Sequence, residues 1–257
     1  MGYEYNEFKK DVYKLTNINL DLYKERQMKR RIESLIARKG FSGFEDFFKG
    51  MKQDVDLLHT FVTYLTINVS QFYRNPAQWE TFDKEIIPYL IQNFGKKITI
   101  WSAACSTGDE PYSLVMALSE FVPLNQIRIV ATDISDEVVG KAKIGLYSEK
   151  SIAHVPDKYK KEYFTQNGPF YQISDKIKNC VTFKKHNLLK DDFFKEQHLI
   201  VCRNVLIYFT EDAKDEIFEK YYDSLADGGV LFIGSTEQIL KYRQIGYKKL
   251  DSFFYQR

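Results

Sequence analysis

Hydrophobic and polar positions follow two different patterns along this chain. Up to about residue 74, apolar side chains recur at the spacing of amphipathic helices, as in the stripe formed by Met28, Ile32, Leu35 and Ile36. From Ile98 onward, short apolar runs typical of buried strands alternate with helical patterns, which favours a parallel sheet. The pattern therefore predicts an all-helical first part and an α/β second part.

Helical spacing and helix-end residues set approximate limits for the helices and for the domain of the first part. Helical spacing predicts helices around residues 5–15, 24–39, 44–48 and 55–65. Gly40 ends the second of these helices. Asn75 reads as a cap and Pro76 as a first-turn proline, which together start a helix through roughly Asn93. The predicted domains are a helical domain with its linker over residues 1–75 and an α/β domain over residues 76–257.

In the second part, the apolar pattern predicts one sheet, and the alternation of strands and helices is interrupted once. Strands are expected near residues 98–101, 127–134, 181–183, 198–202 and 230–235, with a final hairpin within 247–256. Thr210 caps a helix that is expected to end at Gly228-Gly229. Between Gly145 and about Val181 the alternation breaks, and FYQISDKIKNCVTF reads as two short strands around a polar turn. This predicts a small inserted β-subdomain over about residues 146–182.

A loop of small residues joins the first predicted strand to the next helix, in the stretch ITIWSAACSTGDEPYSL. Small side chains such as Ala103, Ser106 and Gly108 let a ligand approach the backbone, as in the nucleotide sites of α/β folds. Asp109 and Glu110 stand where a pyrophosphate would lie, and the stretch has neither GxGxxG nor a phosphate-loop lysine. The acids favour a cofactor with cationic and hydroxyl groups, such as S-adenosylmethionine. An ordinary tight strand–helix connection is the alternative.

An acid also ends the second predicted strand. Asp133 closes the run IRIVATD, about 25 residues after Gly108, where a carboxylate can accept hydrogen bonds from a ribose diol. A helix-capping aspartate is the alternative, and the spacing favours the ribose contact.

Composition excludes several classes of protein. The chain has 257 residues, is 44% hydrophobic and 28% charged, and carries a net charge of only +2, so no overall charge favours nucleic acid. Three cysteines without CxxC spacing predict small buried residues and neither a disulfide framework nor a metal site. No apolar signal segment or uncharged membrane-length run occurs, so we expect a cytoplasmic protein without membrane insertion.

The second predicted helix is strongly basic. Between Asp21 and Lys39 only Glu25 and Glu33 oppose a run of seven basic residues: Lys24, Arg26, Lys29, Arg30, Arg31, Arg38 and Lys39. A solvated surface face is the usual meaning of such a run. The confinement of the charge to one helix also fits a docking surface for an acidic partner.

Five stretches, in order, resemble one family: LTINVSQFYR, IWSAACSTGDEPYSL, ATDIS, HNL and CRNVLIYF. The chain is similar to the bacterial chemotaxis protein methyltransferases, the CheR family. The resemblance implies a Rossmann-like S-adenosylmethionine-dependent methyltransferase domain, an all-helical N-terminal domain and an inserted β-subdomain. It implies methyl transfer to glutamate side chains on the cytoplasmic helices of methyl-accepting chemotaxis receptors, leaving methyl esters and S-adenosylhomocysteine.

The resemblance also implies a set of cofactor contacts: Asn68, Ser70, Arg74, Glu110, Asp133, Asn187, Leu188, Asn204 and Val205. No catalytic base is expected, because a glutamate carboxylate with a pKa near 4.3 is already ionised at neutral pH. Positioning and desolvation are expected to supply the rate. The glutamate-rich receptor helices would dock on the basic helix, through Arg30, Arg31 and Arg38.

Three other classes remain as alternatives. A nicotinamide-dependent dehydrogenase would share the strand, loop and Asp133, but GxGxxG is missing. A nucleic-acid N-methyltransferase would carry an NPPY-like motif where this chain has Arg203-Asn204. A receptor-binding adaptor would have lost some of the motif residues.

Some family members also hold a receptor C-terminal peptide through a glycine-bearing loop. Gly168 is the only glycine between residues 147 and 197, so we do not favour that tether.

Overall fold

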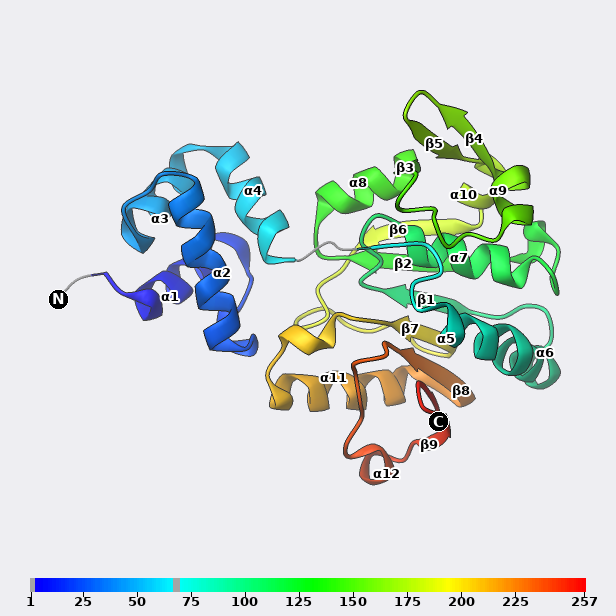
Figure 1. The fold of residues 1–257 in the computed structure, drawn as a ribbon. Coiled ribbons are helices and arrows are strands. Elements are labelled where there is room, and N and C mark those ends of the chain that lie inside the picture. The colour runs from blue at the N-terminus through cyan, green and yellow to red at the C-terminus, as the bar shows by residue number, and fades with distance from the viewer. Residues whose placement is uncertain (1–2, 67–69) are drawn as a thin grey trace. The chain divides into compact units, whose positions relative to one another are not determined.

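The computed structural model describes residues 3–66 and 70–257, which fall into two compact units (Figure 1). Of the described residues, one unit comprises 3–66 with Tyr208–Lys214, and the other comprises 70–207 with Asp215–Arg257. In neither of these described ranges is there a helix of the length and apolar character that a membrane crossing requires.

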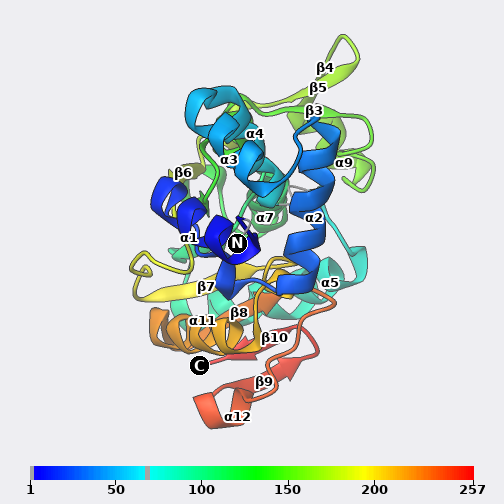
Figure 2. The ribbon, with the colours of Figure 1, turned by 90° about the vertical axis from the view of Figure 1, so that its left-hand side faces the viewer.

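The first unit is helical, as the apolar spacing predicts. Its helices are α1 (Tyr5–Thr16), α2 (Glu25–Arg38), α3 (Phe44–Gln53) and α4 (Val55–Leu65), drawn in blue and cyan in Figure 2. Aromatic rings fill the core, where Phe8 lies 5.0 Å from Phe44 and 5.9 Å from Phe61 between ring centroids. All four residues of the predicted α2 stripe are buried against this core: Met28, Ile32, Leu35 and Ile36.

The second unit is built on a mixed sheet, and the predicted α/β class is confirmed. The strands of the described main sheet follow the order β6-β2-β1-β7-β8-β10-β9. Their bounds are β1 (Ile100–Ala103), β2 (Ile129–Asp133), β6 (Val181–Lys185), β7 (Gln197–Cys202), β8 (Leu225–Ile233), β9 (Lys248–Asp251) and β10 (Phe254–Gln256). The first five in the spatial order pair in parallel, whereas β10 runs antiparallel to both of its neighbours, as the predicted final hairpin requires.

Both faces of the sheet are buried. Ile100 belongs to the large core cluster on one face, which includes Leu114 of α7 (Asp109–Leu118). The next residue, Trp101, contacts Tyr221 of α11 (Glu211–Ser224), with ring centroids 5.5 Å apart. Because successive side chains of a strand point to opposite faces, helices are needed on both sides, as in parallel sheets generally.

One predicted helix end is wrong, and one predicted cap lacks its side-chain bond. The helical segment begins at Pro76 after Asn75, as predicted, and runs from α5 (Pro76–Thr81) through a π-turn (Phe82–Ile86) to α6 (Ile87–Phe94), but Asn75 has a φ of 61° and makes no side-chain capping bond. Thr210 does cap α11, yet that helix ends at Ser224 rather than at Gly228-Gly229. Leu225 already pairs with Gln197, and a bulge in β8 accommodates the extra residues before the regular ladder resumes.

The inserted region forms a separate three-stranded antiparallel sheet. Its order is β3 (Leu146–Ser148), β5 (Phe170–Ile173) and β4 (Phe164–Asn167), accompanied by α9 (Asp157–Tyr163). The two short strands predicted within residues 170–183 are present as β5 and β6, but a short helix, α10 (Asp175–Lys178), replaces the predicted polar turn between them. β5 pairs with β4 across a turn that contains Gly168, whereas β6 joins the main sheet. The remaining α-helices among the described residues are α8 (Asp136–Ile144) and α12 (Tyr242–Ile245).

Candidate functional site

The candidate site lies at the carboxyl ends of four adjacent strands. Strand register pairs Ser102 of β1 with Ala131 of β2 and with Val201 of β7, so the loops that follow these strands emerge side by side (Figure 1). β6 adds the fourth loop, because Asp133 pairs with Lys185. This edge is where open α/β sheets bind their ligands.

Asp133 holds the small-residue loop after β1. One oxygen of its buried carboxylate accepts the backbone N–H of Ser106 at 2.8 Å, and the other accepts that of Ser135 at 3.1 Å. Burial raises the pKa of Asp133, while the hydrogen bonds from Ser135 and Ser106 act to lower it. Each oxygen has a second lone pair, so the carboxylate can still accept from a diol.

The loop is closely packed at Gly108, which has a φ of 88°. A Cβ atom there would lie 3.0 Å from the Cβ of Ala142 and 3.1 Å from the hydroxyl oxygen of Tyr147. That hydroxyl donates to the backbone carbonyl of Thr107 at 2.7 Å. Glycine is therefore needed at position 108 for two reasons: the backbone has a positive φ, and neighbouring side chains leave no room for a Cβ atom, as expected for a loop of small residues.

Glu110, in the first turn of α7, is held by two partners. Ser102 donates its hydroxyl to Oε1 at 3.0 Å, and Nη1 of Arg203 lies 3.5 Å from Oε2. Burial raises the pKa of Glu110, and the charge of Arg203 opposes that shift. The position brings the carboxylate to the same edge as Asp133.

Arg203 is a central residue that sequence reasoning did not single out. Its Nη2 donates to the backbone carbonyl of Arg74 and to Oε1 of Gln78, both at 2.6 Å. The guanidinium carbon also lies 4.7 Å from the ring centroid of Phe232. Arg203 thus joins the segment after β7 to the predicted contacts Arg74 and Glu110. A charged residue between a buried strand and a predicted contact is the signal that could have found it.

Asn204 and Val205 follow Arg203 in a loop held by a second residue that the sequence analysis missed. Glu237 is buried, and its carboxylate accepts the backbone N–H groups of Asn204, Val205 and Leu206 at 2.9, 3.0 and 2.8 Å. The N–H of Gly234 adds a fourth bond at 2.7 Å. None of the five motifs quoted from the sequence includes Glu237, although an acid four residues after a buried strand is an available signal.

The HNL stretch follows β6 directly. The backbone N–H of His186 donates to the carbonyl of Asp133 at 2.9 Å, which places Asn187 beside the end of β2. The side chain of Asn187 accepts from the N–H of Leu189 at 3.0 Å, and Leu188 is buried. Both predicted contacts in this stretch therefore lie at the same edge as Asp133.

Of the other predicted cofactor contacts, Asn68 lies outside the described residues, and Ser70 lies at the small-residue loop, where its hydroxyl donates to the carboxylate of Asp109. Burial raises the pKa of Asp109, and the hydrogen bonds from Thr107 and Ser70 oppose that shift. The three predicted docking residues, Arg30, Arg31 and Arg38, belong to α2 in the first unit.

The site fits a ligand rich in polar groups. Five of the seven described non-glycine residues with positive φ lie in its segments: Tyr73, Asn75, Ala104, Ser106 and Asn204. Such conformations concentrate at binding sites. Within the described residues, the buried Ser106 Oγ and Asn204 Oδ1 have no hydrogen-bond partner. These atoms, with the carboxylates of Asp133 and Glu110, match the ammonium, ribose and sulfonium groups of S-adenosylmethionine.

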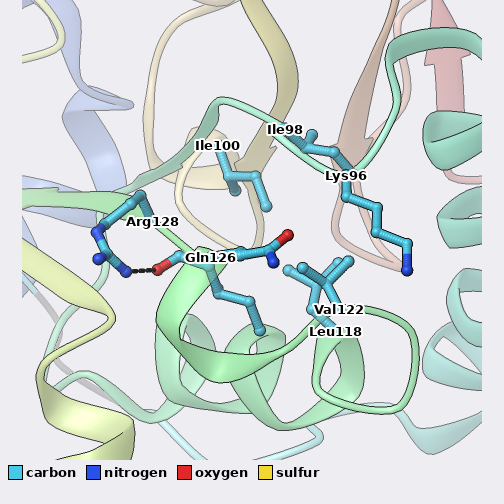
Figure 3. A pocket seen from close by; sticks show the side chains of 8 residues that line it. Lys96, Ile98, Ile100, Leu118, Val122, Gln126 and Arg128 are labelled. Carbon is cyan, nitrogen blue, oxygen red and sulfur yellow. Dashed lines mark hydrogen bonds between the residues drawn. The ribbon is translucent and has the colours of Figure 1, made fainter.

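A small pocket elsewhere in the second unit does not belong to this site (Figure 3). It lies at the amino ends of β1 and β2, opposite the edge that carries Asp133. Its lining is mostly aliphatic, without a carboxylate: Lys96, Ile98, Ile100, Leu118, Val122, Gln126, Ile127 and Arg128.

Comparison with known proteins agrees with this geometry. Residues 68–252 match the model of the "CheR methyltransferase, SAM binding domain", and residues 3–66 match the "CheR methyltransferase, all-alpha domain". The protein is therefore an S-adenosylmethionine-dependent methyltransferase with a Rossmann-like domain and a helical N-terminal domain. The chain belongs to the CheR family, and the resemblance seen in the sequence is confirmed.

Curated relatives cover nearly the whole chain. A chemotaxis protein methyltransferase of Listeria innocua serovar 6a is 42% identical over 252 residues, which are 98% of this chain and 96% of that protein. A chemotaxis protein methyltransferase of Borreliella burgdorferi is 32% identical over 252 residues, covering 93% of this chain and 89% of that protein.

Proposed function

We propose that this enzyme methylates glutamate side chains on the cytoplasmic helices of chemoreceptors, for sensory adaptation. The name shared by the curated relatives, chemotaxis protein methyltransferase, supports this acceptor class. The observation that carries the proposal is the polar edge formed by Glu110, Asp133 and Asn204 in a chain of this family. We propose the nine residues named for the cofactor as its contacts.

The chemistry needs little from the protein beyond position. Bound S-adenosylmethionine supplies an electrophilic methyl group on a sulfonium. An acceptor carboxylate forms the new C–O bond as the C–S bond breaks, so a neutral ester and a neutral thioether result. Opposite charges disappear together, and a dry, aligned site favours such a reaction. Asp133 would accept the ribose hydroxyls, and Glu110 would hold positive charge near the loop.

The basic face of α2 is our candidate for receptor docking. Arg30 and Arg38 are exposed, so they are available to an acidic helix. Arg31 is partly engaged within its own domain, because its Nη2 donates to the carbonyl of Tyr64 at 2.7 Å. The docking proposal therefore rests mainly on Arg30 and Arg38. We do not propose a peptide tether through the β4–β5 turn at Gly168, and tight binding of a receptor C-terminal peptide would contradict this.

The deciding experiment combines the full chain, methyl-labelled S-adenosylmethionine and a receptor cytoplasmic fragment. We expect label in the fragment that mild alkali releases as methanol, since carboxyl methyl esters hydrolyse readily. A fragment with its glutamates replaced by glutamine serves as the control and is expected to remain unlabelled. Alkali-stable label, or no label from a protein that binds S-adenosylhomocysteine, would overturn the proposed acceptor.

A further inference from the structure

We propose that Glu237 is a positioning residue for the cofactor, which it serves by fixing the backbone of the loop after β7. This inference rests on the proposed cofactor contacts at Asn204 and Val205. Glu237 lies 33 residues beyond Asn204 in the chain, yet its carboxylate is bonded directly to that loop.

One carboxylate satisfies four backbone donors. Oε1 accepts from Val205 and Leu206, and Oε2 accepts from Asn204 and Gly234, at distances between 2.7 and 3.0 Å. Hydrogen bonds to an ionised acceptor are stronger than neutral ones. They hold Asn204 at a φ of 60°, a left-handed conformation that a side-chain-bearing residue seldom adopts without support.

The direction of these bonds determines what the loop offers to a ligand. In a trans peptide the carbonyl points opposite to the N–H of the same peptide unit. Because the N–H groups of Val205 and Leu206 point to Glu237, the carbonyls of Asn204 and Val205 point away from it. The carbonyl of Val205 accepts the first hydrogen bond of the short 3₁₀ helix Leu206–Tyr208. Glu237 therefore leaves the carbonyl of Asn204 as the backbone acceptor that is turned outward, suited to N–H donors such as those of the adenine or the ammonium group of the cofactor.

Gly234 packs tightly against both the loop after β7 and the carboxylate of Glu237. A Cβ atom at Gly234 would lie 2.7 Å from the backbone nitrogen of Asn204 and 2.7 Å from Oε2 of Glu237. Real Cβ atoms essentially never make such contacts with backbone, so the carboxylate or the loop would have to shift. Gly234→Ala therefore perturbs the same bonds without removing the charge of Glu237.

The test compares Glu237→Gln with Glu216→Gln, an exposed glutamate of α11. Glutamine keeps the shape but presents an NH₂ group to two N–H donors. We expect Glu237→Gln to raise the dissociation constant of S-adenosylhomocysteine about tenfold or more, measured by calorimetry on folded protein. The rate at saturating S-adenosylmethionine and the KM for the receptor fragment should stay near the wild-type values. Gly234→Ala should show the same split, and Glu216→Gln should show no change.

Two outcomes would overturn the inference: unchanged affinity in Glu237→Gln, or a lost rate that no cofactor concentration restores. If neither loop variant folds, amide hydrogen exchange of the wild-type protein decides. Residues 204–206 should exchange slowly before any cofactor is added, and rapid exchange that slows only with S-adenosylhomocysteine would contradict a preset loop. Wild-type protein that fails to bind S-adenosylhomocysteine would instead count against the proposed site.

Discussion

Arg203 and Glu110 form an ion pair that is largely closed to water. Nη1 of Arg203 lies 3.5 Å from Oε2 of Glu110, and the two side chains are 2% and 14% exposed. The pair is tolerated because each partner has further bonds, from Ser102 to Glu110 and from Arg203 to Gln78 and to the backbone of Arg74. Removing one partner would leave the other charge buried and uncompensated.

Arg203→Met should therefore destabilise the protein strongly. We expect the free energy of unfolding to fall by about 3–5 kcal/mol, the usual cost of breaking a buried pair from one side. Urea denaturation at pH 7 measures this, with Arg128→Met as the control because Arg128 is exposed in the same unit. An equal change in both variants would show that the buried pair has no special role.

Asp133→Asn should weaken cofactor binding without unfolding the protein. Asparagine can still accept one of the two backbone bonds, but it loses the charge and one acceptor oxygen offered to the ribose. We expect the dissociation constant of S-adenosylhomocysteine to rise about tenfold. Asp136→Asn, three residues along and exposed, is the matched control. Equal affinities for all three proteins would remove Asp133 from the proposed contacts.

Asp133 and Glu110 could be placed from the sequence, because Asp133 closes a predicted strand and Glu110 lies in the first turn of the helix that follows the first predicted strand. Arg203 and Glu237 could not, because their partners are remote: Gln78 is 125 residues from Arg203, and Asn204 is 33 residues from Glu237. The spacing of apolar and polar residues within a segment indicates which segment ends at the edge of the sheet. It does not indicate which side chain, remote in the sequence, makes the hydrogen bonds that fix that segment.

The same limit explains the errors in the fold. Apolar spacing predicts α1 to α4, because burial of one helix face sets that spacing. Continuous apolar runs predict the parallel strands, because both faces of those strands are buried. It cannot choose the partner of a short strand, and so Phe170–Ile173 pairs with β4 across Gly168 rather than with the residues after it. The domain limits at residue 75 and the insert over residues 146–182 remain predictions.

Charge reversal on α2 should slow receptor methylation while leaving the cofactor site intact. We expect the double variant Arg30→Glu with Arg38→Glu to raise the KM for the receptor fragment severalfold at low salt, because both residues are exposed and would repel an acidic helix. The difference should shrink as salt screens the charges. Lys10→Glu, exposed on α1, is the control. An unchanged KM with unchanged salt dependence would end the docking proposal.

Asp83 lies in the π-turn after α5 and has no hydrogen-bond partner for its buried Oδ1 within the described residues. Burial raises the pKa of its carboxyl from 3.8 to about 6; the charge of Glu120 acts in the same direction, and that of Lys158 opposes it. A raised pKa means that the folded state binds the proton more tightly than the unfolded state. The stability linked to Asp83 is therefore complete below pH 3.8 and is lost as the pH rises through about 6.

Asp83→Asn should accordingly stabilise the protein in a pH-dependent way. The amide is always neutral, so the variant avoids the cost of an ionised, half-buried carboxylate above pH 6. We expect its melting temperature to exceed that of the wild type at pH 8 and to converge with it near pH 4. Glu85→Gln, an exposed acid two residues along the same turn, should show no such divergence. A gap between Asp83→Asn and the wild type that is constant with pH, or widens toward acid, would show that ionisation of Asp83 is not linked to folding.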